Sequence, residues 1–274
     1  MTDTIVVSPR AARTYQRLLR FGRQLAGFIA LFVIWEVGVR VFHVKEYVLP
    51  PPSQVFEAAW EHWSSMAQGA WTTTLEIVAG YVLAIVISVP LAVSIAFSRL
   101  VEQTVYPVMV FLQIVPKIAV APLFIIWFGF GFTPKLLLVF LLSFFPIVIS
   151  SIAGFRSIDP EIMDFVHTTG AGGWKAFLKV RLPHALPDIF TGLKVGAALS
   201  ATAAVVAEFV ASDRGLGYQL LQYNGDLNTQ MVFAIIILLS AIGVIVYFVV
   251  ELLQRIVIPW HVSTTQGTGG IELT

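Results

Sequence analysis

The sequence predicts an all-α integral membrane protein with about six transmembrane helices. Hydrophobic residues make up 57% of its 274 residues and charged residues only 12%. The chain is therefore more apolar and less charged than soluble domains are on average. Apolar runs near the length that spans a bilayer recur along the chain. These runs lack the two-residue alternation of barrel strands, and lipid cannot satisfy free backbone groups. We therefore expect every span to be a helix.

Six candidate spans follow one another along the chain. They cover residues 25–42, 71–97, 104–131, 136–155, 186–210 and 231–254. Segment 1–24 holds five arginines, and no small-residue cleavage site follows the first span closely, so we expect a retained helix and not a signal peptide. We expect residues 25–255 to form a single transmembrane domain. Residues 256–274 include the polar stretch "STTQGTGGIELT" and are predicted to form a disordered tail.

Lysine and arginine are distributed unevenly between the two sides of the predicted membrane. Eleven lie on one side, Arg10, Arg13, Arg17, Arg20, Arg23, Arg99, Arg156, Lys175, Lys179, Arg181 and Arg255; three lie on the other, Lys45, Lys135 and Arg214; and Arg40, Lys117 and Lys194 lie inside spans. The positive-inside rule places the larger set, with both termini, in the cytoplasm. The net charge of +1 gives no overall field that would favour nucleic acid.

The outer loop after the first span predicts a helix at the membrane surface. The stretch "VLPPPSQVFEAAWEHWSSM" begins with prolines and then continues with regularly spaced apolar residues. Those on one predicted helical face are Val55, Phe56, Ala59, Trp60, Trp63 and Met66. Tryptophan suits the headgroup boundary, so we expect an interfacial anchor. A docking surface for an extracytoplasmic partner is the alternative.

The third span carries prolines and an intramembrane lysine. Pro107, Pro116 and Pro122 are expected to break the helix, which is tolerated where the backbone faces protein or a water-filled cavity. Gln113 and Lys117 lie four residues apart on one face. A buried lysine is costly and indicates function, so both are candidates for a translocation path that suits an anionic solute. Alternatively, the lysine snorkels or pairs with a carboxylate on another span.

Two further spans hold charged or small residues of interest. Gly192 and Gly196 predict close packing of the fifth span against another helix, in the same chain or in a second copy. Glu208 lies near the outer end of that span and is the third candidate path residue. The following loop, "DRGLGYQLLQYNGD", is a candidate for an external gate. Glu36 and Arg40 in the first span are four apart and are predicted to pair with each other.

The cytoplasmic loop after the fourth span predicts two short helices. Asp159 is a good N-cap, Pro160 fits the first helical position and Glu161 favours the positive end of the helix. Gly170 supplies the left-handed residue that ends such a helix. A second helix, "WKAFLKV", is expected to be closed by Pro183.

Aromatic residues in these two helices predict a contact surface. Phe165, Trp174 and Phe177 lie among basic residues, and exposed aromatic clusters are typical of protein interfaces. The alternative is that both helices lie on the spans of the same protein or on lipid headgroups.

This loop, residues 156–183, resembles the cytoplasmic loop of ABC importer permeases. The family pattern is Glu-Ala-Ala, three residues, Gly, nine residues and Ile-x-Leu-Pro. Here the same spacing joins Asp164-Phe165-Val166, Gly170 and Val180-Arg181-Leu182-Pro183. Most of residues 48–255 is also similar to permeases of the nitrate, sulfonate and taurine type. The matching stretches are "VLPPPSQV", "APLFIIWFGFG", "TTGAGGWKAFLKVRLPHALPDIFTGLK" and "VVAEFVASDRGLGYQLLQ".

The resemblance implies a permease subunit whose loop is a coupling helix docked on a separate ATPase. The residues it marks are Asp164, Phe165, Val166, Gly170, Ala171, Trp174, Leu182 and Pro183. Implied partners are a second copy of the chain, two ATPase copies that bind ATP and Mg²⁺, an extracytoplasmic solute-binding protein and membrane lipid. The implied location is the bacterial inner membrane. The implied solute is a sulfonate, nitrate, an aromatic acid or a vitamin precursor. Aspartate replaces the usual glutamate, and Phe165 and Val166 replace two alanines.

The sequence shows no catalytic constellation. The phosphate-binding pattern G-x-x-x-x-G-K-[ST] is absent, as are H-E-x-x-H and G-x-S-x-G, and there is no cysteine. The histidines are scattered: His43, His62, His167, His184 and His261. We therefore expect a non-catalytic chain without metal. An ATP-independent secondary transporter or channel is the alternative function, but it would favour inverted repeats and an ion site, and the sequence shows neither.

Overall fold

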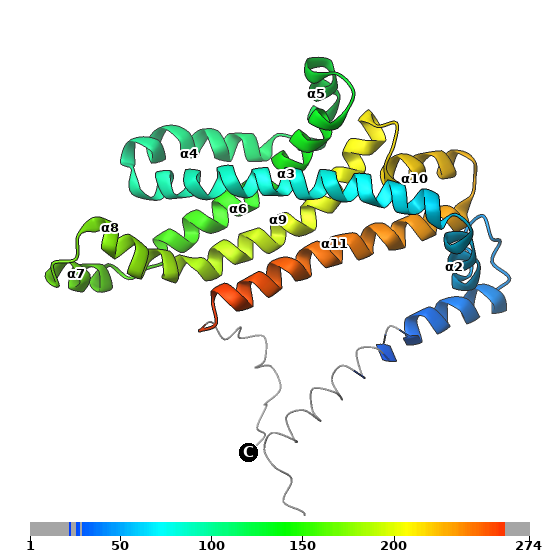
Figure 1. The fold of residues 1–274 in the computed structure, drawn as a ribbon, viewed down its shortest axis with the longest axis horizontal. Coiled ribbons are helices and arrows are strands. Elements are labelled where there is room, and N and C mark those ends of the chain that lie inside the picture. Colours follow the sequence, from blue (N-terminus) through cyan, green and yellow to red (C-terminus); the bar gives the residue numbers. More distant parts are fainter. Residues whose placement is uncertain (1–21, 23–25, 28, 261–274) are drawn as a thin grey trace, which may run out of the picture. The chain divides into compact units, whose positions relative to one another are not determined.

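The computed structural model describes residues 22, 26, 27 and 29–260, and in these residues the only regular elements are helices. The all-helical prediction is therefore confirmed (Figure 1). Residues 1–21 of the predicted N-terminal segment and 261–274 of the predicted disordered tail lie outside the described residues. The chain forms two compact units, Met1–Trp63 with Tyr223–Ala234 and Ser64–Gln222 with Ile235–Thr274. Each unit is described by itself.

The helices follow one another with short connections. Residues 29–41 are helical. The elements after them are α2 (Pro52–Glu61), α3 (Trp63–Phe97), α4 (Arg99–Ile114), the 3₁₀ turn η1 (Lys117–Val120), α5 (Ala121–Phe128), α6 (Phe132–Arg156), α7 (Pro160–Thr168), α8 (Gly173–Ala176), the π-helical turn η2 (Phe177–Arg181), α9 (Leu182–Ala211), α10 (Leu216–Gly225) and α11 (Thr229–Val257).

Four helical segments of the described chain are long and apolar enough to cross a membrane. They are α3, α6, the joined segment Gly173–Val210 and α11. A fifth is possible if the bent pair Arg99–Ile114 and Lys117–Phe128 forms one broken span. The predicted first span includes residues 25 and 28, which lie outside the described residues, so it stays a prediction.

The predicted break within residues 104–131 is present, because the helix bends by 90° between Ile114 and Lys117. Val115 takes an extended conformation, as residues before a proline do, and Pro116 cannot donate a backbone hydrogen bond. Pro107 remains inside α4 and Pro122 lies in the first turn of α5. Of the three prolines expected to break the helix, only Pro116 does so.

In the larger unit, α6 and α9 lie side by side (Figure 1). A Cβ added at Gly192 would lie 2.7 Å from Ser150 Cβ, and one at Gly196 would lie 3.1 Å from Ile147 Cδ1. The two glycines therefore serve close packing within the chain, which was one of the two alternatives that the sequence left open.

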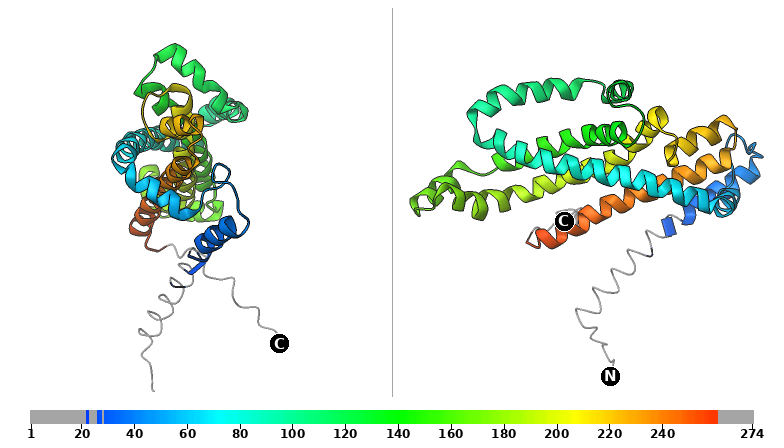
Figure 2. Two further views of the ribbon diagram at one scale, coloured as in Figure 1. Left: turned by 90° about the vertical axis from the view of Figure 1, so that its right-hand side faces the viewer. Right: turned by 45° about the horizontal axis from the view of Figure 1, so that its top comes forward.

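The chain reverses between α3 and α4, so α4 runs back along α3 (Figure 2). Ser98 caps the N-terminus of α4, since its Oγ accepts a hydrogen bond from Val101 N at 3.4 Å. Met109 of α4 packs in one buried cluster with Ile95 of α3 and Ile152 of α6. A second cluster joins Tyr81 and Ala84 to Phe190, Val250 and Ile258.

The smaller unit confirms the predicted Glu36–Arg40 pair, whose nearest N and O atoms are 2.5 Å apart. Glu36 also accepts hydrogen bonds from Ser53 N at 3.0 Å and Ser53 Oγ at 2.9 Å, in the first turn of α2. Both observations give the Glu36 carboxylate a structural role, since it joins the first helix to the start of α2.

The predicted single apolar face over residues 55–66 is wrong, because α2 ends at Glu61 and α3 begins at Trp63. Val55 and Met66 are 1% and 2% exposed, whereas Trp60 is 84% exposed and Trp63 58%.

Candidate functional site

The first helix of the loop 156–183 is α7, and the local signals predicted for it are confirmed. Glu161 N donates to Asp159 Oδ1 at 2.9 Å, and Pro160 opens the helix. Gly170 has a φ of +73°, a conformation that side chains disfavour. Asp159 and Pro160 therefore fix the start of α7, and Gly170 fixes its end.

The second predicted helix does not end at Pro183. α8 continues through the π-helical turn η2 into α9, and Pro183 lies in the first turn of α9. A proline ring clashes with the carbonyl four residues earlier in a regular helix, and a wider π turn relieves such a clash. α8 is thus joined to α9 without a break in the helical backbone.

Phe177 anchors this loop to the long helices. Its ring centroid lies 5.4 Å from that of Phe97, 6.0 Å from Phe155 and 5.5 Å from Trp174. The guanidinium carbon of Arg181 lies 4.8 Å from the centre of the Phe97 ring. Aromatic pairs and cation–π contacts at these distances stabilise the junction of η2 with α3 and α6.

Other residues of the loop remain free to contact a partner. Phe165 is 70% exposed and Trp174 is 71% exposed, whereas Met163 of the same loop is only 6% exposed. Next to them lies a cavity of about 350 Å³ lined by Val93, Phe97, Met163, Trp174, Phe177 and Arg181 among others. Of the remaining predicted coupling residues, Asp164 and Gly170 are exposed, and Val166, Ala171, Leu182 and Pro183 are half-buried. Part of the loop packs on the protein's own spans, since Met163 and Ala176 are buried and Phe177 lies against Phe97 and Phe155.

Gln113 and Lys117 come together at the break between α4 and α5. Lys117 Nζ donates to the backbone oxygen of Gln113 at 2.8 Å and lies 4.8 Å from the centre of the Phe145 ring. Both line a cavity of about 610 Å³ with Pro146 and Ser150. Among the described residues no carboxylate pairs with Lys117.

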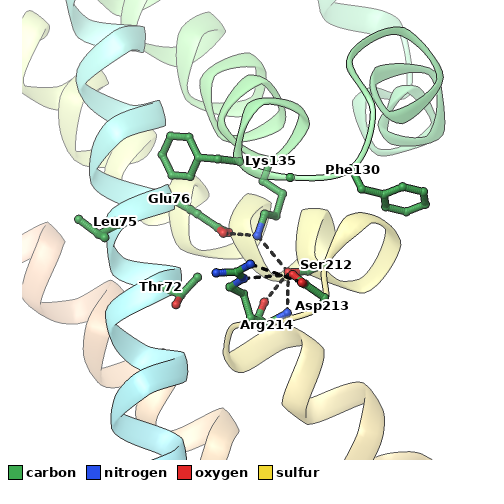
Figure 3. A pocket seen from close by; sticks show the side chains of 10 residues that line it. Thr72, Leu75, Glu76, Phe130, Lys135, Ser212, Asp213 and Arg214 are labelled. Atoms are coloured by element: carbon green, nitrogen blue, oxygen red, sulfur yellow. Dashed lines mark hydrogen bonds and ion pairs between the residues drawn. The ribbon is translucent and has the colours of Figure 1, made fainter.

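A second polar cavity, of about 690 Å³, lies elsewhere in the same unit (Figure 3). Glu76 of α3 and Lys135 of α6 form an ion pair in its wall, with side chains 1% and 4% exposed. The predicted fourth span begins at residue 136, directly after Lys135, whereas α6 begins at Phe132 and so includes Lys135. Sequence reasoning did not single out Glu76, although a glutamate inside an apolar run is itself a signal of a buried polar site.

The loop after α9 forms another part of that cavity wall. Ser212 Oγ accepts a hydrogen bond from Lys135 Nζ at 3.0 Å. Arg214 Nε lies 3.2 Å from Asp213 Oδ1, and this hydrogen bond holds the pKa of the Asp213 carboxyl below its usual value. Both side chains are exposed, so their pair adds little to stability.

Glu208, the third predicted path residue, does not lie with Gln113 and Lys117. It is 1% exposed and hydrogen-bonded to Thr73 of α3 and to Gly217 of α10. No cluster of metal-binding side chains occurs among residues 22, 26, 27 and 29–260.

Comparisons with known proteins agree with these features. Residues 80–259 match the family model described as "Binding-protein-dependent transport system inner membrane component". The chain is 35% identical to the riboflavin transport system permease protein RibX of Chloroflexus aurantiacus over 94% of its length and 97% of that protein. It is 29% identical to the taurine transport system permease protein TauC of Escherichia coli, covering 84% of this chain and 86% of the relative.

A solved structure has the same fold. The MetNI methionine ABC transporter in an inward-facing conformation contains a chain that superposes with a TM-score of 0.63 at 17% identity. The superposition covers 72% of the chain described above and 98% of the solved chain.

Proposed function

Because the chain belongs to the family of binding-protein-dependent transport system inner membrane components and is a permease subunit of an ABC importer, we propose that its loop 156–183 couples solute passage to a separate ATPase. The exposed pair Phe165 of α7 and Trp174 of α8 carries this proposal, because α8 is joined to α9 without a break in the helical backbone. Aromatic side chains supply much of the binding energy of protein interfaces. Because α8 and α9 are joined, a displacement of α8 by the ATPase would also move α9.

The transport cycle then needs partners for its remaining steps. ATP and Mg²⁺ bind to two copies of the ATPase, and this chain contributes no catalytic residue. A second copy of the chain completes the translocation path. An extracytoplasmic binding protein delivers the solute. The excess of basic residues in loops on one side supports cytoplasmic termini in a bacterial inner membrane. Residues 25–255 act as one transmembrane domain in this proposal.

Removing the exposed aromatic pair tests the coupling. The rate of ATP-dependent uptake into proteoliposomes should fall about tenfold in the double variant Phe165→Ala and Trp174→Ala, because two aromatic contacts with the ATPase are lost. The matched control is Trp71→Ala, a similarly exposed tryptophan on α3. Co-purification with the ATPase should weaken only in the double variant. Normal uptake by the double variant would contradict docking through this loop.

We further propose that Gln113 and Lys117 line the path and that the solute is a small anion. An ammonium group without a carboxylate partner, facing a cavity, favours a negative charge there. Taurine, the solute named for one relative, carries a sulfonate, whereas riboflavin, named for another, is a vitamin. A sulfonate, nitrate, an aromatic acid and a vitamin precursor are therefore the solutes to test.

Lys117→Met is the corresponding variant. It should raise the KM for an anionic solute by about tenfold, since a charge-assisted contact is lost. Lys194→Met is the control, because Lys194 also lies in a span and contacts the Tyr247 ring at 5.9 Å. Equal KM values for wild type and Lys117→Met, measured as solute uptake, would exclude Lys117 from the path.

A further inference from the structure

Glu208 is buried where three segments of the chain meet. Its Oε1 lies 2.6 Å from Thr73 Oγ1 on α3, and its Oε2 accepts a hydrogen bond from Gly217 N on α10. Thr73 Oγ1 also accepts from Leu216 N at 2.9 Å. Glu208 of α9 thus connects α3 to the start of α10.

The hydroxyl group of Thr73 has one hydrogen but two possible acceptors. Gly69 O lies 3.0 Å from Thr73 Oγ1, and Glu208 Oε1 lies 2.6 Å from it. If Glu208 is ionised, the single hydrogen can serve only one of the two oxygens. If Glu208 carries a proton, it donates to Thr73 Oγ1, and Thr73 donates to Gly69 O. The protonated form therefore gives both hydrogen bonds of the Thr73 hydroxyl group a hydrogen.

The charges around Glu208 favour the same state. The ionisable group in contact with Glu208 is Glu76 of α3, whose carboxyl group lies within hydrogen-bond reach of it. Beyond Glu76 lie Lys135 of α6 and Arg214 of the loop after α9, and Asp213 of that loop lines the same cavity. Lys135 already pairs with Glu76, and Arg214 pairs with Asp213. In the described part of the chain no cation is left for Glu208. Burying an unpaired carboxylate costs several kcal/mol, and a bound proton removes that cost.

Gly215 and Gly217 leave room for the Glu208 carboxyl group because they have no side chain. Gly215 has a φ of +107°, and a Cβ there would overlap Glu208. A Cβ on Gly217 would lie 2.8 Å from Glu208 Oε2 and 2.9 Å from Val205 O. The segment Ser212–Gly217, called here the GLG segment, is therefore shaped to lie directly on Glu208.

We propose that Glu208 is a proton-binding site, which holds a proton while the GLG segment lies against it and, in this neutral form, fastens that segment to α3. Ser212, Asp213 and Arg214 of the GLG segment form part of the wall of the 690 Å³ cavity. Loss of the proton leaves an unpaired buried charge and releases that wall. The inference does not depend on the coupling loop or on the nature of the solute.

Infrared spectroscopy of the full chain in lipid tests the protonation directly. A protonated carboxylic acid has a C=O band distinct from that of a carboxylate. The wild type should show this band at neutral pH, and Glu208→Gln should remove it. Glu102→Gln is the control, because Glu102 is partly exposed and paired with Arg156, and it should leave the band unchanged. A wild-type spectrum without a band that depends on Glu208 would overturn the proposal.

Labelling of a single cysteine tests the fastening, since the chain has no cysteine of its own. Leu216 is fully buried, so Leu216→Cys should react slowly with a water-soluble maleimide. Glu208→Gln, which keeps both hydrogen bonds without charge, should leave that rate unchanged. Glu208→Ala should raise it by about tenfold or more, because two contacts are lost. Equal, fast labelling in the Gln and Ala variants would contradict a neutral Glu208, even if Glu208→Ala assembles poorly.

Discussion

The Glu76–Lys135 pair shows at the residue scale how a charge can be kept inside a membrane protein. Lys135 is 3% exposed, and its partners are the Glu76 carboxylate and Ser212 Oγ. The net value of such a pair is small, because desolvation of both ions offsets their attraction. Removing one partner is different, since it leaves the other charge buried and alone.

Glu76→Gln should therefore destabilise the chain by about 3–5 kcal/mol, as seen for broken buried ion pairs. The double variant Glu76→Gln with Lys135→Met should recover most of that loss, because neither charge then remains. Thermal unfolding of the detergent-solubilised chain, followed by size-exclusion chromatography, measures both. A single variant as stable as wild type would show that the pair is not buried as described.

The ion pairs Glu36–Arg40 and Glu76–Lys135 differ in how far sequence reasoning could predict them. Glu36 and Arg40 are four residues apart on one helix, so their spacing alone predicts the contact. Glu76 and Lys135 lie on different helices, and only the packing of α3 with α6 brings them together. Local periodicity holds no information about such a contact.

At the element scale, the packing of α6 against α9 depends on residues without side chains. Gly192→Ala should destabilise the chain by about 1–3 kcal/mol, because the new Cβ would meet Ser150 Cβ at 2.7 Å and Pro146 O at 2.9 Å. Gly225→Ala is the matched control, since no atom lies within 4 Å of a Cβ there. Thermal unfolding compares them, and equal midpoints would exclude tight packing at Gly192.

Helix boundaries were predictable where short-range signals decide them. Asp159, Pro160 and Gly170 fix both ends of α7 through capping and a left-handed residue. Prolines misled the prediction, because Pro107 and Pro183 lie within continuous helical segments while Pro116 marks a sharp bend. Whether a proline bends a helix depends on neighbouring helices and on turns such as η2, which no sequence window contains.

At the scale of the whole molecule, large apolar side chains remain exposed along α4 and α5. Phe111 is 68% exposed, Ile114 78%, Ile126 75% and Trp127 63%. The high apolar content of the sequence predicts such exposed surfaces, since a membrane protein needs apolar residues on the outside as well as in its core. Lipid or a second copy of the chain can cover them. Composition holds no information about which surface meets which neighbour.

The most direct test of the proposed ATP-driven mechanism is solute uptake into proteoliposomes that contain the chain with its ATPase, the binding protein and a labelled sulfonate. The same measurement is repeated with the chain alone. The account predicts uptake that requires ATP, the ATPase and the binding protein together. Equal uptake by the chain alone, driven only by a solute or ion gradient, would contradict it and establish a secondary transporter or channel instead.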